Sequence, residues 1–163
     1  MSVVRVCFVC MGNICRSPTA EAVMKRSAEE AGLVHRLEVD SAGTADFHIG
    51  ELPDRRARAE ARRRGLELAS RARQVHVGDF EYFDLMVAMD ELNAALLRDL
   101  APDTAAAAKV RLLMDFAEDG AGSPDVPDPY LGGAEDFSHV FELVEGACGG
   151  LLDHLRAVHD LRP

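Results

Sequence analysis

An apolar stretch that runs directly into a cysteine-containing loop is the strongest constraint on how this chain can fold. Residues 3–9 (VVRVCFV) are nearly all apolar and rich in β-branched side chains, which is typical of a central parallel strand covered on both faces. Residues 10–16 (CMGNICR) follow, and Ser17 and Pro18 then open a helical pattern. The chain is therefore predicted to pass from a buried strand through a tight loop into the N-terminus of a helix.

The spacing within this loop predicts an anion-binding site. Five residues separate Cys10 from Arg16, which lets the backbone N–H groups of the loop point inward at one anion while the guanidinium binds two of its oxygens. The positive end of the following helix adds to this attraction. A thiol among such groups favours its thiolate form. Residues 10–17, called the Cys10 loop below, are thus expected to bind an anion and to aim Cys10 at it as a nucleophile.

The rest of the chain alternates helical and strand patterns, which predicts an α/β fold. The 163 residues fit one domain, an open four-stranded parallel sheet with helices on both faces and ligands at the carboxyl ends of the strands. Further strands are expected at residues 37–43, 85–89 and 109–114, helices at 17–31, 54–64, 91–100 and 137–158, a short amphipathic turn at 79–83 and a long surface loop at 117–129.

The net charge and the hydropathy of the sequence indicate which kinds of binding partner are unfavourable. The formal net charge is −10, which argues against nonspecific binding to nucleic acid or to a membrane surface. No apolar run is long enough to span a bilayer, and residues 1–9 lack a signal-peptide pattern because Arg5 interrupts them. We therefore expect a cytoplasmic protein without membrane insertion, present as a monomer or weak dimer. The arginine-rich helix at 54–64 is interpreted as an exposed face, with an interaction patch as the alternative.

The four cysteines are assigned different environments. Cys7 and Cys10 form a Cys-x-x-Cys pair, which would suit zinc or redox chemistry, but no second pair at ligand spacing follows. Strand alternation turns Cys7 into the core, so we interpret it as a buried filler. Cys148 lies on the apolar stripe of the last helix and is also expected in the core.

Several motifs together resemble the low-molecular-weight protein tyrosine phosphatases. The likeness runs from Val3 to the last helix and rests on residues 10–18 (CMGNICRSP), 40–44 (DSAGT), 72–74 (ARQ), 89–90 (MD) and 128–130 (DPY). It implies hydrolysis of a phosphotyrosine-containing protein or a small phosphate monoester through a phosphocysteine, without metal or cofactor. From the residues alone, Asp128 between two prolines fits a turn aspartate as well as a general acid. The resemblance implies the acid, beside Cys10 as nucleophile and Arg16 as phosphate ligand.

The resemblance also implies roles for surrounding residues. It gives Ser17 a hydrogen bond to the Cys10 sulfur and assigns Asn13 and Ser41 to holding the loop, with Asp90 in support. Cys15 is implied, as in some family members, to form a reversible disulfide with Cys10 that protects it from irreversible oxidation. The remaining loop positions and the implied cleft walls are Met11, Gly12, Ile14, Phe47, His48, Tyr130 and Leu131.

The sequence leaves two alternative functions open. A thiol-dependent arsenate reductase of the same fold would need a downstream cysteine pair, whereas only Cys148 follows the loop. A non-catalytic phosphotyrosine-binding module would be expected to lack Cys10, Arg16 or the acid, and all three are present.

Overall fold

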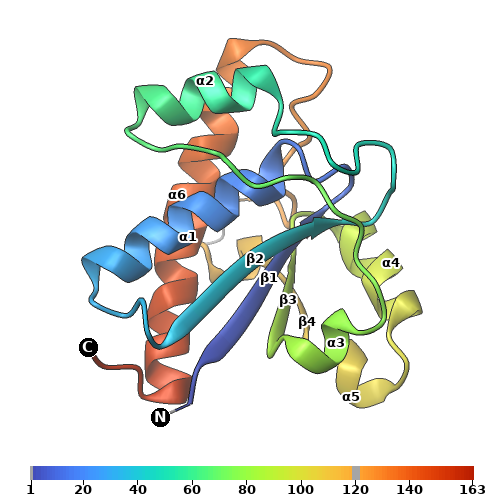
Figure 1. Ribbon diagram of the computed structural model, residues 1–163, viewed down its shortest axis with the longest axis vertical. Coiled ribbons are helices and arrows are strands. Elements are labelled where there is room, and N and C mark those ends of the chain that lie inside the picture. The colour runs from blue at the N-terminus through green and yellow to red at the C-terminus, as the bar shows by residue number, and fades with distance from the viewer. Residues whose placement is uncertain (1, 119–121) are drawn as a thin grey trace.

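Four parallel strands form the centre of the computed structural model, which describes residues 2–118 and 122–163 (Figure 1). They are β1 (Val4–Cys10), β2 (Leu37–Gly43), β3 (Leu85–Ala88) and β4 (Val110–Leu112), in the spatial order β2-β1-β3-β4. Val6 of β1 pairs with Val39 on one side and Leu85 on the other. The prediction of an open four-stranded parallel sheet is confirmed.

Helices cover both faces of this sheet. On one face lie α1 (Arg16–Glu30) and α6 (Ala134–His159), and on the other lie α3 (Asp79–Tyr82), α4 (Glu91–Leu100) and α5 (Thr104–Ala107) (Figure 1). The remaining elements are α2 (Arg55–Arg63), which packs near the N-terminal half of α6, and the 3₁₀ helix η1 (Leu113–Phe116). Among the described residues, no helix combines the length and apolar character needed to cross a bilayer.

The apolar run of β1 is explained by two cores that share one strand. Val6 and Phe8 pack with α1 and α6, whereas Cys7 and Val9 pack on the opposite face with α4 and the residues around α3. The part of β1 from Val6 onward is covered on both sides, which disfavours polar side chains, whereas Arg5 near its start is partly exposed. Cys7 and Cys148 are both fully buried, so their predicted positions in the core are confirmed.

Some predicted boundaries shift in the structure. The strand expected at 109–114 ends at Leu112, because the chain tightens there into η1. The short helix α5 was not predicted, although Asp103 is the signal for it, since its carboxylate accepts a hydrogen bond from the N–H of Ala106 at 2.8 Å. The expected loop at 117–129 has no helix or strand in its described part, and residues 119–121 lie outside the described residues.

Close packing explains why residue 150 in α6 is a glycine. A Cβ placed on Gly150 would overlap the carbonyl oxygen of Phe116, so helix and η1 approach to a distance that only glycine permits. Gly149 has open space around the same position. Close packing therefore explains one of the two glycines in the middle of this helix.

The strand order creates the crevice that a ligand needs. The chain leaves β1 on one side to form β2 and later returns to the other side of β1 as β3, so the sheet order reverses at β1. In open α/β sheets, ligands bind outside the carboxyl ends of the strands at this reversal. The segments that follow β1 and β3 there are the Cys10 loop and Asp90.

Candidate active site

Cys10 is the last residue of β1, and its sulfur is held by two short contacts. The backbone N–H of Asn13 donates to Sγ at 3.3 Å, and the Ser17 hydroxyl lies 3.0 Å from it. The end of β2 packs tightly against the same loop, because a Cβ on Gly43 would come within 2.7 Å of the Met11 carbonyl oxygen. Cys10 is only 3% exposed. The loop is therefore built into the sheet edge rather than lying free above it.

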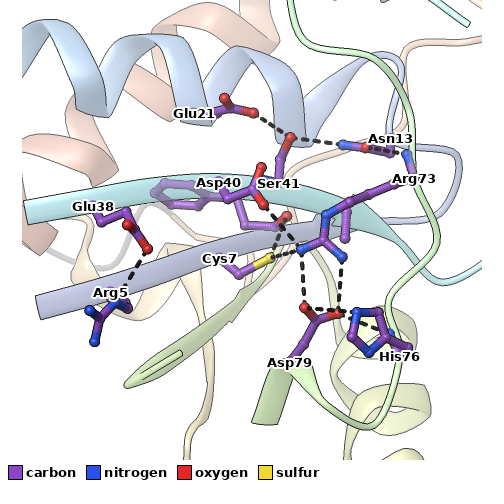
Figure 2. Close-up of polar contacts among 12 residues, drawn as sticks. Arg5, Cys7, Asn13, Glu21, Glu38, Asp40, Ser41, Arg73, His76 and Asp79 are labelled. Carbon is purple, nitrogen blue, oxygen red and sulfur yellow. Dashed lines mark hydrogen bonds and ion pairs between the residues drawn. The ribbon is translucent and has the colours of Figure 1, made fainter. Parts of the chain in front are cut away.

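Asn13 organises the inside of the Cys10 loop (Figure 2). Its φ of 56° is left-handed, a conformation that asparagine tolerates better than most residues. Its side-chain amide donates to Ser17 Oγ at 2.8 Å and to Ser41 Oγ at 2.9 Å, while its carbonyl oxygen accepts from the N–H of Arg73 at 3.1 Å. Because Ser17 Oγ accepts from Asn13, its own proton is free for the Cys10 sulfur at 3.0 Å or for the Ala42 carbonyl at 3.4 Å.

A buried glutamate that sequence reasoning missed extends this network. Ser41 Oγ donates to Glu21 Oε1 at 2.6 Å (Figure 2), and the other oxygen of Glu21 binds Lys25 Nζ at 2.6 Å. Glu21 is 6% exposed. Its signal was available in the sequence, because it lies four residues after Ser17 on the face of α1 that turns toward the sheet. Its carboxylate accepts the Ser41 proton, which leaves Ser41 Oγ to accept from the Asn13 amide.

Arg73 supports the loop from the other face of the sheet (Figure 2). Its guanidinium binds Asp79 at 3.1 Å and Asp40 at 3.2 Å, and lies 3.8 Å from the sulfur of Cys7. Burial opposes its charge, but the hydrogen bond to Asp79 and the neighbouring groups outweigh burial and raise the pKa of Arg73. Burial raises the pKa of the Cys7 thiol, which keeps that residue protonated in the core.

Arg16 is buried and fixed at the start of α1. One of its terminal nitrogens, Nη1, donates to Asp90 Oδ2 at 2.6 Å and to the carbonyl of Val126 at 3.0 Å, and the other lies 3.6 Å from Asp128 Oδ2. Burial opposes the charge of Arg16, but Cys10, Asp90 and Asp128 outweigh it and raise its pKa. A guanidinium that is permanently charged and already oriented is well suited to bind a phosphoryl group.

Asp90 connects Arg16 to the N-terminus of α4. It caps α4, where its Oδ1 accepts from the N–H of Asn93 at 2.7 Å while its Oδ2 faces Arg16. The sequence placed Asp90 in support of the site, and the structure brings it into direct contact with Arg16.

Residues 126–132, called the acid segment below, carry Asp128 to the same place. The segment begins where the N–H of Val126 donates to the carbonyl of Met89 at 2.8 Å. The side chain of Asp128 is 41% exposed, and its Oδ1 accepts from the N–H of Tyr130 at 3.1 Å. Asp128 thus faces both solvent and Arg16, as a group that exchanges protons with water requires.

A cavity of about 160 Å³ joins these groups. Each residue that lines it was predicted for the loop, the acid or the cleft walls. The lining residues are Cys10, Met11, Gly12, Ile14, Cys15, Arg16, Phe47, His48, Asp128 and Tyr130. A wider groove of about 760 Å³ between α1, η1 and α6 does not include the Cys10 loop, so size alone does not identify the reactive site.

The structure does not bring Leu131 into the cavity, which corrects the sequence expectation. Its side chain is 96% exposed and is not among the lining residues. The reason is a turn in the backbone, in which the N–H of Gly132 donates to the carbonyl of Pro129 at 2.9 Å and which leaves Leu131 at its outer side. Phe47 does line the cavity but is 70% exposed, at its mouth.

The interpretation of the arginine-rich helix as an exposed face is only partly correct. Arg62 and Arg63 are mostly exposed, at 62% and 58%. Arg64 instead binds Glu60 at 2.8 Å and Glu145 of α6 at 2.7 Å. Arg56 donates to backbone carbonyls of the acid segment. Sequence periodicity could not show the contacts to α6 and to the acid segment, because these partners lie more than 70 residues away along the chain.

Cys15 is buried beside Cys10 and Asp54. Burial, followed by the negative charge of Asp54, raises the pKa of the Cys15 thiol well above its ordinary value. Cys15 is therefore held as a thiol. Within residues 2–118 and 122–163, no group of three or more histidine, cysteine or carboxylate side chains is arranged to hold a metal ion.

The chain is similar to known proteins in both sequence and fold. The family model of the low molecular weight phosphotyrosine protein phosphatases matches residues 5–160. A low molecular weight protein-tyrosine-phosphatase of Streptomyces coelicolor is 50% identical over 153 residues, which is 93% of each chain. Among solved structures, a protein tyrosine phosphatase from Entamoeba histolytica with Hepes in its active site has a TM-score of 0.92 at 38% identity, covering 96% of this chain and 99% of that one.

A structure with lower sequence identity holds a phosphonate ligand. Vibrio vulnificus Wzb, solved in complex with benzylphosphonate, has a TM-score of 0.81 at 27% identity and covers 94% of this chain and 100% of its own. The match of the family model over nearly the whole length, together with these likenesses, shows that the chain belongs to the low-molecular-weight protein tyrosine phosphatase family.

Proposed function

We propose that this protein hydrolyses phosphotyrosine and small aryl phosphate monoesters through a phosphocysteine intermediate. The observation that carries the proposal is that Cys10, Arg16 and Asp128 line one cavity of about 160 Å³ although Asp128 is more than 100 residues from the other two along the chain. A nucleophile, a fixed cation and an acid are the three groups that phosphoryl transfer to a thiol requires.

In the first step, the Cys10 thiolate attacks phosphorus as the bond to the leaving oxygen breaks. Asp128 gives its proton to that oxygen, so the product leaves as a neutral phenol and a phosphocysteine remains. Arg16 and the backbone N–H groups of the Cys10 loop stabilise the charge on the three other phosphoryl oxygens.

In the second step, the Asp128 carboxylate removes a proton from water, and the oxygen of that water attacks phosphorus. The sulfur–phosphorus bond breaks, inorganic phosphate leaves, and Cys10 returns to the thiolate. The Ser17 hydroxyl, 3.0 Å from the sulfur, stabilises the departing negative charge.

The walls of the cavity favour an aromatic substrate. Phe47, His48 and Tyr130 stand at its mouth, with the rings of His48 and Tyr130 6.2 Å apart. A flat phenyl group can pass between such walls, whereas Cys10 itself is 3% exposed and lies at the base. The complex of the Vibrio vulnificus relative with benzylphosphonate supports an aryl-bearing phosphoryl ligand.

Hydrolysis of 4-nitrophenyl phosphate in metal-free buffer tests the proposal. Wild type is expected to release phosphate, whereas Cys10→Ser is expected to release none above background. An inactive wild type, or an active Cys10→Ser variant, contradicts the proposal. The arsenate reductase alternative gains no support, because Cys148, the one cysteine that follows the Cys10 loop, is buried in α6 against the carbonyl of Ala20.

We also propose that oxidation of Cys10 is reversible through Cys15. Peroxide converts the Cys10 thiolate to a sulfenic acid, and the Cys15 thiol then displaces water from it to give a disulfide. Wild type treated with peroxide should regain activity with a thiol reductant, and Cys15→Ser should not. Equal recovery of both proteins excludes this role.

The expected compartment and assembly complete the proposal. The four cysteines are unpaired, as is usual for proteins kept in a reducing compartment, which supports the expectation of a cytoplasmic protein. Subcellular fractionation tests the compartment, and sedimentation tests the expected monomer or weak dimer.

A further inference from the structure

Arg56 of α2 is the side chain that joins the acid segment to the rest of the site. Its terminal nitrogens donate to the carbonyl of Tyr130 at 2.8 Å and to the carbonyl of Gly132 at 3.1 Å. Among the described residues, the other polar contact between residues 127–132 and another part of the chain is the 3.6 Å ion pair of Asp128 with Arg16. Val126 anchors the start of the acid segment through its backbone bonds to Met89 and Arg16, and Arg56 supplies the two hydrogen bonds that hold the part after Asp128.

Arg56 is itself held against the Cys10 loop. Its Nε and Nη2 bind the two carboxylate oxygens of Asp54 at 3.1 and 3.0 Å. The N–H of Asp54 in turn donates to the carbonyl of Ile14 inside the loop at 2.8 Å. The chain of contacts thus runs from the Cys10 loop through Asp54 and Arg56 to the acid segment.

Aromatic rings fix the plane of the guanidinium. Its central carbon lies 4.6 Å from the ring centre of Phe137, which is buried in α6, and 5.6 Å from that of Tyr130 at the cavity mouth. A planar cation stacked on a ring can direct several donors at once, whereas a lysine ammonium cannot reproduce that fork.

We propose that Arg56 is a positioning residue that fixes the acid segment, and with it Asp128, at the working distance from Cys10. This inference rests on the proposed function, in which Asp128 protonates the leaving oxygen. Arg56 does not line the cavity, and it holds the acid segment through the carbonyls of Tyr130 and Gly132. The Cys10 loop keeps its own hydrogen bonds among Ser17, Asn13 and Ser41 when Arg56 is lost, so the loss impairs proton donation more than phosphoryl binding.

The test compares substrates whose leaving groups differ in their need for a proton. Arg56→Met is expected to lower kcat/KM for phenyl phosphate about tenfold, and that for 4-nitrophenyl phosphate by no more than about twofold. Arg56→Lys should be intermediate. Arg55→Met, at an exposed position one residue earlier on α2, is the matched control and should match wild type for both substrates.

A double variant separates positioning from a general loss of folding. In the Asp128→Ala background, Arg56→Met should change kcat/KM by less than about twofold, because the acid it positions is absent. An equal loss on both substrates, or an undiminished effect in that background, overturns the inference. Should Arg56→Met not fold, Arg56→Lys is judged by the same two criteria.

The same measurements distinguish failure of this inference from failure of the proposed function. If Asp128→Ala itself shows no dependence on the leaving group, the proposed acid role is wrong. If Asp128→Ala shows that dependence and neither Arg56 variant does, only the positioning role is wrong.

Discussion

The two halves of the candidate site are built in different ways. The Cys10 loop is buried and is held through Ser17, Asn13, Ser41 and Glu21 by hydrogen bonds of 2.6–3.0 Å. The acid segment is largely exposed, and its position depends on long-range contacts from side chains of other elements. The nucleophile is therefore preorganised by the core, whereas the acid lies on a separately anchored segment.

This difference has a chemical consequence. Groups that bind the phosphoryl oxygens must be fixed before the reaction, because their reorganisation would add to the barrier. The acid must exchange its proton in each cycle, which requires access to solvent. Changes in the Cys10 loop should therefore affect every substrate alike, and changes in the acid segment should affect substrates according to their leaving group.

After Cys10→Ser, Arg16→Lys is expected to cause the largest loss of activity. It removes the two-nitrogen contact to the phosphoryl group and the bonds to Asp90 and Val126, so kcat/KM should fall about 10³-fold or more for every aryl phosphate. Steady-state kinetics with phenyl and 4-nitrophenyl phosphate check this. A variant that retains more than about a tenth of the activity would contradict the proposed role.

Asp128→Ala comes next and should discriminate between substrates. For phenyl phosphate the loss in kcat/KM is expected to be about 10²-fold or more, because its leaving oxygen needs a proton. For 4-nitrophenyl phosphate the loss should be much smaller. Circular dichroism of the variant serves as the control for folding, and equal losses on both substrates would refute the role of the acid.

Substitutions of Asn13 should show a moderate effect that separates backbone strain from hydrogen bonding. Asn13→Gly tolerates the φ of 56° but removes the bonds to Ser17 and Ser41, whereas Asn13→Ala removes the bonds and also strains the backbone. Each should lower kcat/KM about tenfold on both substrates, with Asn13→Ala also lowering the melting temperature. Wild-type activity in Asn13→Gly would show that the network is dispensable.

The smallest effect is expected for Glu60 of α2, which lies outside the candidate active site and affects only the stability of the fold. Burial of Glu60 favours its protonated form, but hydrogen bonds from Arg63 and Arg64 outweigh burial and lower its pKa. Because the pKa of Glu60 is lower in the folded state, this group stabilises the fold at pH values above the ordinary glutamate pKa, and that contribution is lost as pH falls through the lowered pKa of the folded state.

Glu60→Gln measures that contribution. At neutral pH the variant should be less stable by about 1 kcal/mol, and the difference from wild type should shrink as pH falls. Urea unfolding at several pH values gives both quantities. A difference that grows toward acid pH would contradict the assigned direction of the shift.

The sheet, the main helices and the Cys10 loop could be predicted from the sequence, because each depends on local patterns. The apolar run before Cys10 and the spacing to Arg16 are visible within a few residues of each other. The position of Glu21 on the inward face of α1 was visible in the sequence, but its bond to Ser41 was not, because only the folded chain brings the two together. The role of Arg56 was missed for the same reason, since its partners lie more than 70 residues away. Leu131 was misplaced because a turn, not composition, sets its direction.

The central claim is that the Cys10 loop binds and attacks the phosphoryl group while the acid segment protonates the leaving group. It is tested most directly by one ratio, kcat/KM for phenyl phosphate divided by kcat/KM for 4-nitrophenyl phosphate. It is measured in wild type, in Ser17→Ala as a change in the Cys10 loop, and in Asp128→Ala as a change in the acid segment. Ser17→Ala should lower both values and leave the ratio unchanged, whereas Asp128→Ala should lower the ratio at least about tenfold. A ratio that falls in Ser17→Ala, or that stays constant in Asp128→Ala, would contradict the account.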